Sequence, residues 1–177
     1  NKESVNVIGV VSGQIETNHL KRNVKVMNGA YSHTDAICKI AVIERYKETG
    51  NVGVGLVEGM GLKEGAIAQS IAHDSHNIMV IGDNDLDMVI AANHIAAIQG
   101  GITIVSKGEI IATLELPIAG LMSNQEPLVV MNAVQQLNTI AKNMGVPDAI
   151  DPFLTLGFMA LPVIPHIRVT DQGLFDS

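Results

Sequence analysis

Several stretches of the chain show the apolar patterns that predict β-strands. Residues 5–11 are rich in β-branched side chains that roughly alternate, and residues 24–27 repeat this character over a shorter length. Residues 52–57 and 78–81 are short apolar runs bounded by glycine or polar residues, which is typical of buried strands. A further pair of apolar runs flanks Lys107-Gly108 and predicts a β-hairpin, formed by residues 102–105 and 110–116.

A first helix is predicted between Asp35 and Lys47. Ala36, Ile37, Ile40, Ala41 and Ile43 would form one apolar face of this helix. The outer face would carry the charged residues Lys39, Glu44, Arg45 and Lys47. Thr34 or Asp35 is available as the N-cap, and Gly50 would close the helix. The segment is therefore expected to be an amphipathic helix.

Two further helices are predicted from capping signals. Asp83-Asn84-Asp85 supplies a cap and first-turn negative charge for a helix that reaches Gln99. That helix is apolar on nearly every side, so we expect it to be covered on more than one side. The next helix begins after Ser123-Asn124, has Pro127 in its first turn, and stops at Gly145-Val146-Pro147.

The tail and the order of these elements indicate the fold class. Residues 152–177 are apolar and interrupted by Pro162 and Pro165, so we expect extended segments that cross the body of the domain. Helices and strands alternate only loosely, which favours an α+β fold, a mixed α/β sandwich with about three main helices packed on a mixed β-sheet. A length of 177 residues predicts one domain over residues 1–177.

Composition narrows the classes of partner. Hydrophobic residues make up 47% of the chain, but no apolar run approaches the roughly 20 residues that cross a bilayer, so we expect no membrane span. The net charge is −7 and the eleven Lys and Arg are scattered, which argues against nucleic acid as a partner. Cys38 is the single cysteine and is expected to be a buried thiol, which suits a cytoplasmic protein. The chain opens without an initiator Met or a signal pattern, so we expect it to start at a domain boundary.

The segment His73-Asp74-Ser75-His76-Asn77 is the densest set of functional groups, and it lies directly before an apolar run. His73 and His76 could bind a divalent metal ion if the backbone turned there, with Asp74 as a ligand or as a partner of a ligand. The same imidazole and carboxylate groups could exchange protons with a substrate near neutral pH. A third interpretation is a tight turn in which the polar groups bond to one another and to the backbone. The residues alone leave these three interpretations open.

Other candidate motifs are weaker. The glycines of residues 53–55 and 59–61 lack the Lys-Ser/Thr pair of a phosphate loop and are expected at turns and close backbone approaches. Three aspartates, Asp83, Asp85 and Asp87, lack the spacing of a calcium loop, so helix capping is favoured. The chain contains no Gly-x-Ser-x-Gly elbow and no His-x-His metal pair. By these criteria no catalytic centre is evident.

Ordered blocks of residues resemble the C-terminal domain of bacterial adenine deaminases. The block Ile67–Ile78, followed by Asn84–Met88, is similar to that family, and the resemblance covers nearly the whole chain. His166-Ile167-Arg168 departs from the family pattern, in which an acidic residue and a lysine are more usual. Further similar blocks follow in the same order, at residues 116–123, 152–158, 161–165 and 170–174.

This resemblance implies a function for a longer protein. The full-length enzyme would hydrolyse adenine to hypoxanthine and ammonia by metal-activated water, with manganese or iron held by a (β/α) barrel that precedes residue 1. The fragment alone is expected to bind no metal and to be inactive. In the full-length enzyme it would contribute to active-site closure or subunit packing, with its own N-terminal catalytic barrel as partner. His73, Asp74, His76 and Asn77 match the family pattern and are the candidate site residues.

Two other hypotheses stand beside this one. A freestanding small-ligand or metal-binding module would use His73 and His76 as its site. A structural dimerisation domain would use the apolar tail, and a homo-oligomer is expected in either the enzyme or the dimerisation hypothesis.

Overall fold

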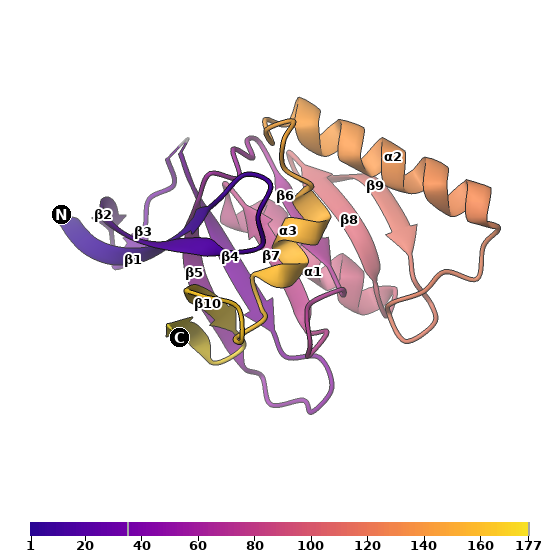
Figure 1. The fold of residues 1–177 in the computed structure, drawn as a ribbon, viewed down its shortest axis with the longest axis horizontal. Helices are drawn as coiled ribbons and strands as arrows, with labels where there is room; N and C mark the ends of the chain where they lie inside the picture. Colours follow the sequence, from indigo (N-terminus) through magenta and orange to yellow (C-terminus); the bar gives the residue numbers. More distant parts are fainter. Residues whose placement is uncertain (35, 177) are drawn as a thin grey trace.

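The computed structural model describes residues 1–34 and 36–176, which form a large β-sheet with helices on both faces (Figure 1). The strands follow the order β3-β2-β1-β5-β4-β7-β6-β8-β9, and β10 and β11 form a separate hairpin. The pairing of β1 with β5 is parallel and the other pairings in this sheet are antiparallel, so the sheet is mixed. The strands are β1 (Lys2–Val10), β2 (Thr17–Met27), β3 (Ala30–Tyr31), β4 (Ile37–Ile43), β5 (Val52–Glu58), β6 (Ala66–Gln69), β7 (Ile78–Gly82), β8 (Gly101–Ser106), β9 (Glu109–Glu115), β10 (Ile167–Thr170) and β11 (Gly173–Asp176). The helices are α1 (Asp85–Ala97), α2 (Pro127–Asn143) and α3 (Pro152–Phe158).

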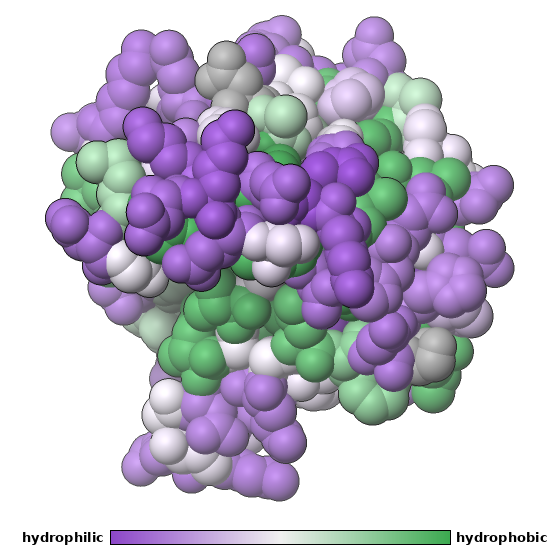
Figure 2. Space-filling model, turned by 90° about the vertical axis from the view of Figure 1, so that its left-hand side faces the viewer, coloured by the Kyte–Doolittle hydropathy of each residue, from purple (hydrophilic) through white to green (hydrophobic). Residues whose placement is uncertain are grey.

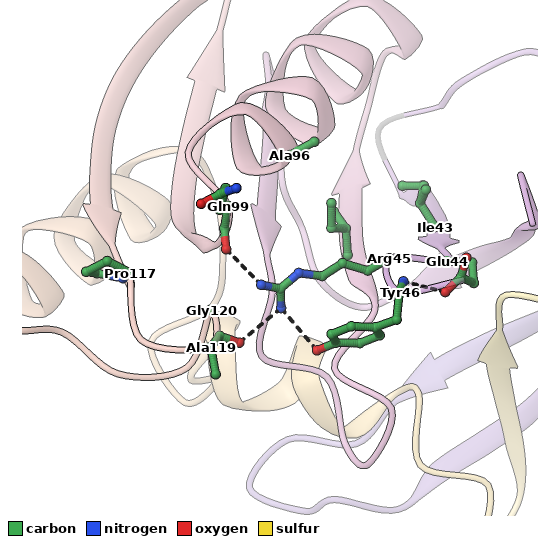
Figure 3. A pocket seen from close by; sticks show the side chains of 10 residues that line it. Ile43, Glu44, Arg45, Tyr46, Ala96, Gln99, Pro117, Ala119 and Gly120 are labelled. Carbon is green, nitrogen blue, oxygen red and sulfur yellow. Dashed lines mark hydrogen bonds between the residues drawn. The ribbon is translucent and has the colours of Figure 1, made fainter. Parts of the chain in front are cut away.

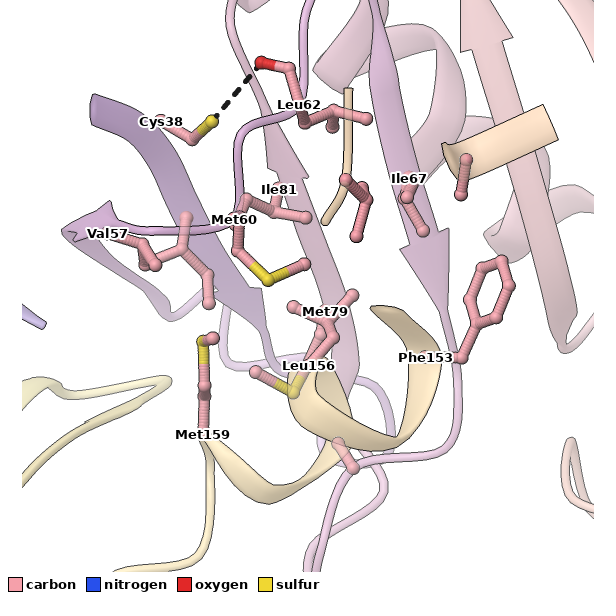
Figure 4. Close-up of a cluster of buried hydrophobic side chains, with 14 of the residues drawn as sticks. Cys38, Val57, Met60, Leu62, Ile67, Met79, Ile81, Phe153, Leu156 and Met159 are labelled. Atoms are coloured by element: carbon pink, nitrogen blue, oxygen red, sulfur yellow. Dashed lines mark hydrogen bonds between the residues drawn. The ribbon is translucent and has the colours of Figure 1, made fainter. Parts of the chain in front are cut away.

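The two faces of the sheet carry separate cores because side chains alternate along each strand. On β7, Met79 and Ile81 join the larger core, which α2, α3 and β10 cover (Figures 1 and 4). Ile78 and Val80 point to the opposite face and pack with α1. This arrangement of a mixed sheet and three helices confirms the predicted α+β class.

The helix predicted between Asp35 and Lys47 is wrong, because Ile37–Ile43 forms strand β4. This strand pairs with β5 on one side and β7 on the other, and both of its faces are covered in part. A central strand tolerates apolar residues at successive positions, so its sequence also fits a helical period. Cys38 is buried as predicted, but on a strand, and Asp35 lies outside the described residues.

The tail is only partly extended. Residues 167–170 and 173–176 form the β10–β11 hairpin as extended chain, whereas Pro152–Phe158 is helix α3. Asp151 caps this helix, since its carboxylate accepts hydrogen bonds from the backbone N–H groups of Phe153 and Leu154 at 3.1 and 2.9 Å. Proline at the first helical position is compatible with such a start, and this signal was present in the sequence.

Helix α1 is confirmed, with Asn84 rather than an aspartate as its N-cap. Asp83 instead accepts hydrogen bonds from the backbone of Glu64 and Gly65. The expectation that α1 is covered on more than one side is wrong for the described chain, because Leu86 and Val89 are 65% and 57% exposed.

The predicted β8–β9 hairpin and helix α2 are confirmed, and strand β6 was not predicted. β6 has only four residues, and all of them are buried between β7 and β8. Gly53 confirms the close approach expected of the residues 53–55, because a Cβ atom there would lie 1.8 Å from the carbonyl oxygen of Thr170. Strand β6, with the sequence Ala-Ile-Ala-Gln, is too short to show a period.

Candidate functional site

His73 to Asn77 lie in the connection between β6 and β7, immediately before β7 as the sequence suggested. The backbone N–H of His73 donates to the carbonyl of Gly157 at 3.0 Å. Its imidazole stacks on the ring of Phe158, with ring centroids 4.6 Å apart. The loop is therefore anchored to helix α3, which is distant in sequence.

His76 is held by a reciprocal pair of contacts with Ala72. The N–H of His76 donates to the carbonyl of Ala72 at 2.6 Å, and the N–H of Ala72 donates to Nδ1 of His76 at 3.2 Å. Burial lowers the pKa of His76, the charge of His73 lowers it further, and Asp74 opposes these effects while Arg45 adds to them. An imidazole that accepts at Nδ1 is neutral and carries its proton on Nε2. His76 is thus arranged as a neutral donor.

The other three residues of the segment have different environments. Asn77 is buried, and its side-chain oxygen accepts a hydrogen bond from the N–H of Arg45 at 3.3 Å. Asp74 and Ser75 are exposed. The rings of His73 and His76 meet edge to face with centroids 5.7 Å apart. The structure therefore brings the two histidines together, while Asn77 supports the end of β4.

Arg45 connects this loop to a pocket of about 540 Å³ (Figure 3). Its guanidinium donates to the carbonyl oxygens of Gln99 at 2.7 Å and Ala119 at 3.3 Å. The hydroxyl of Tyr46 and the same guanidinium both donate to the carbonyl of His76, at 3.2 and 3.5 Å. The Arg45 guanidinium and the Tyr46 phenol therefore form one wall of the pocket, and both are hydrogen-bonded to the backbone of the His73–Asn77 loop.

Two glycines allow the guanidinium to approach so closely. Gly120 has a φ of +72°, and a Cβ atom there would lie 2.2 Å from Nη2 of Arg45. At Gly100, with a φ of +130°, a Cβ atom would lie 3.2 Å from the same nitrogen. The guanidinium thus occupies space that only glycine leaves open.

His73 borders a second, smaller and mainly apolar pocket of about 180 Å³. Gln69 is buried in its wall, where the amide nitrogen donates to the carbonyls of Ile71 at 2.7 Å and Phe153 at 2.9 Å. The amide oxygen of Gln69 has no hydrogen-bond partner in the part of the chain that the structure describes. The His73–Asn77 loop thus borders this pocket through His73 and is linked to the larger pocket through Arg45.

The possible metal ligands of the loop are His73, Asp74 and His76. Within residues 1–34 and 36–176, no group of three or more His, Cys, Asp or Glu side chains is placed to hold a metal ion. Nδ1 of His76 already accepts a backbone N–H, which leaves one nitrogen for coordination. We therefore derive no chemical step through a metal bound by these residues.

Sequence reasoning missed Arg45, Tyr46 and Gln69. Arg45 was expected on the outer face of a helix, whereas it is the residue that joins the loop to the pocket. Its partners are backbone carbonyls of residues 31 to 74 positions away, which leave no pattern in the sequence.

No helix among the described residues is long and apolar enough to cross a membrane. This agrees with the absence of a long apolar run in the sequence.

Comparison with known proteins gives a consistent result. The sequence profile of the adenine deaminase C-terminal domain matches residues 14–177. The adenine deaminase of Clostridium acetobutylicum is 53% identical over 173 residues, which are 96% of this chain and 30% of that protein. The adenine deaminase 2 of Carboxydothermus hydrogenoformans is 47% identical over 172 residues, and the adenine deaminase of Halalkalibacterium halodurans is 44% identical over 176, each with 30% of the relative covered. The chain spans about 30% of the length of these relatives. It belongs to the family of adenine deaminase C-terminal domains.

Proposed function

We propose that this chain serves as the C-terminal domain of a hydrolase that converts adenine to hypoxanthine and ammonia. The observation that carries the proposal is the 53% identity to an adenine deaminase across 96% of the chain. The reaction would use water activated by manganese or iron bound outside this chain. The partner of this domain would be the catalytic barrel of the same polypeptide, in a cytoplasmic homo-oligomer.

We place the contribution of this domain at the His73–Asn77 loop. His76 is held as a neutral imidazole with its proton on Nε2, and His73 lies beside it at a ring distance of 5.7 Å. His73 borders the smaller pocket, and a neutral histidine beside it is able to donate a hydrogen bond or a proton to a bound purine or to water. Contact of the His73–Asn77 loop with the barrel would close the active site, and the residues of the loop would orient the purine or the water bound in it.

The comparisons favour this function over a freestanding binding module. The relatives described above are adenine deaminases that extend well beyond the region matched by this chain. Among the residues that the structure describes, the two histidines also have no third ligand of the kind that a stable metal site in proteins usually needs.

The experiment is a comparison of His73→Ala and His76→Ala in the full-length protein, with His19→Ala as a matched control. His19 lies on β2, outside the loop, and pairs with Asp176 at 2.9 Å. We expect kcat for ammonia release from adenine to fall at least tenfold in the two loop variants, with the melting temperature retained, and to stay within twofold in the control. Unchanged kinetics in folded loop variants would show that the loop only stabilises a turn.

The 177-residue chain alone provides a second test. We expect it to release no ammonia from adenine and to contain no stoichiometric metal by elemental analysis. Deamination by the chain alone would contradict the proposal that the catalytic groups lie in the barrel and not in this domain.

A further inference from the structure

One face of the β-sheet is only half covered. Helix α1 packs over β6, β7 and β8, whereas Val52 and Val54 on β5 are 53% and 50% exposed beside it. The opposite face of β4 and β5 is covered by the β10–β11 hairpin, which approaches Gly53 and Gly55 closely. At the end of the molecule formed by β1, β5 and the β10–β11 hairpin, a hydrophobic band lies between hydrophilic areas (Figure 2).

The uncovered face and α1 form a groove with a regular lining, here named the β4–α1 groove. Its floor is made by alternate residues of β4, namely Lys39, Ala41 and Ile43, together with Val52 of β5 and Val80 of β7. Its wall is α1, which contributes residues three or four apart, as one face of a helix requires. The wall residues are Asp85, Met88, Val89, Ala92 and Asn93, and the volume of this part is about 410 Å³.

The groove continues into the pocket at Arg45. Ile43 lines both cavities, and Ala96 follows Ala92 on the same face of α1. At the other end Lys39 and His33 form ion pairs with Asp85, and Lys39 also borders a further cavity beside Val54. An apolar channel thus runs from an ion-pair cluster to the guanidinium that holds the His73–Asn77 loop.

The dimensions fit one helix. Helices pack about 8–10 Å apart, which is the width of two strands at about 4.8 Å each. The next helix beside α1 would therefore lie over β4 and β5, where Val52 and Val54 of β5 are exposed and Ile43 of β4 is half-buried. The channel from Lys39 to Arg45 extends about 20 Å along the strand direction, enough for a helix of about 13 residues.

We propose that the β4–α1 groove is the docking site for an amphipathic helix from the polypeptide that precedes this chain in the full-length protein. The inference rests on the proposed function, because it takes the missing partner from the same polypeptide. The relatives are long enough to supply such a helix, since this chain spans only 30% of their length. Covalent connection also raises the effective concentration of the segment at the groove.

A second copy of this domain fits the groove less well. Each copy has a net charge of −7, so two copies oppose their approach at low salt. In a symmetric contact, both copies would present the same groove to each other. The projecting helix α1 of one copy would then have to fit into the groove that α1 of the other copy bounds. The tethered helix is therefore the occupant that the charge and shape of the groove favour.

Thiol labelling in the full-length protein tests the proposal. Val89→Cys and Val52→Cys place a thiol in the wall and in the floor of the groove, and Gln136→Cys on α2 is the control at an exposed helical position. Native Cys38 provides a low background, since it is 2% exposed and burial raises its pKa to about 11. The rate of reaction with an aromatic disulfide reagent is compared in the folded protein and in urea.

We expect the two groove thiols to react at least a hundredfold more slowly in the folded protein than in urea, and the control thiol to react within tenfold of its unfolded rate. Groove thiols that react as fast as the control would overturn the proposal. Protection that disappears on hundredfold dilution, together with dissociation in light scattering, would overturn it in favour of a second copy. Ammonia release from adenine is measured on the same samples, so that the two proposals can fail separately. Exposed groove thiols in an active enzyme would contradict only the docking of the helix. Protected groove thiols in an inactive enzyme would contradict only the proposed activity.

Discussion

The carboxylate of Asp87, buried on α1, accepts a hydrogen bond from the backbone N–H of Gly108 at 2.7 Å. The other carboxylate oxygen accepts from the N–H of Lys107 at 3.1 Å and from the side chain of Asn84 at 2.9 Å. One side chain therefore joins the first turn of a helix to the turn of the β8–β9 hairpin.

We expect Asp87→Ala to lower the free energy of unfolding by about 2–4 kcal/mol, because it leaves two backbone donors and an amide without their acceptor. Chemical unfolding in urea measures the change. Asp148→Ala is the control, since the Asp148 side chain is 98% exposed and should change stability by less than about 0.5 kcal/mol. Equal effects of the two substitutions would contradict a structural role for Asp87.

Arg168 is a second buried polar residue with a structural task. It is 0% exposed and donates to the carbonyl oxygens of Ile164, Ile15 and Pro165 at 2.7 to 2.9 Å. Arg168→Met should cost about 3 kcal/mol, because it removes all three hydrogen bonds and leaves the carbonyl oxygens of Ile164 and Ile15 without this donor, whereas that of Pro165 keeps the N–H of Thr17 at 3.4 Å. Arg168→Lys should cost less, since an ammonium group supplies three donors. Thermal unfolding of the two variants gives the order, and a methionine variant as stable as the lysine variant would contradict this account.

The close contact between Gly120 and Arg45 predicts a position-specific cost. Gly120→Ala should lower stability more than Gly13→Ala, because both have a φ near +70° but nothing lies within 4 Å of a Cβ atom at Gly13. We expect an excess of about 1–2 kcal/mol for Gly120→Ala from the displaced guanidinium. In an Arg45→Ala background the excess should vanish, and a double-mutant cycle by urea unfolding measures this coupling.

The lowered pKa of His76 predicts a dependence of stability on pH. The folded state holds the neutral imidazole, so protonation favours the unfolded chain. The contribution is complete above the unfolded value of about 6.5 and is lost as the pH falls through the lower folded-state value. The stability difference between the native protein and His76→Gln should therefore be larger at high pH than at low pH. A difference that is constant across this range would contradict the assignment.

The sequence predicted those elements whose signals are local. Helix α1 and the β8–β9 hairpin have capping residues or a Lys107-Gly108 turn within their own segments, and both were predicted. Strand β4 was predicted as a helix because its identity depends on pairing with β5 and β7, which apolar spacing does not reveal. The short helix α3 was missed although Asp151 and Pro152 mark its start.

In the candidate site, too, local features could be predicted from the sequence and contacts between distant residues could not. The position of the His73–Asn77 loop before β7 could be inferred, because dense polar residues stood before an apolar run. The role of Arg45 could not be inferred, since it arises from carbonyl groups brought together by the fold. The stacking of His73 on Phe158 likewise joins residues that are far apart along the chain.

The parallel junction of β1 and β5 gives the sheet an uneven mechanical strength. Two residue pairs, Ile8 with Val57 and Gly9 with Glu58, join β1 to β5, whereas β1 and β2 pair along nine positions. A bidentate ion pair between Arg22 and Glu58, at 2.6 and 2.8 Å, reinforces this seam from β2. The β1–β3 ribbon is therefore attached to the rest of the molecule by contacts that include two backbone pairs, this ion pair and the hydrogen bond from the Thr17 hydroxyl to the carbonyl of Ile167 on β10 at 2.9 Å.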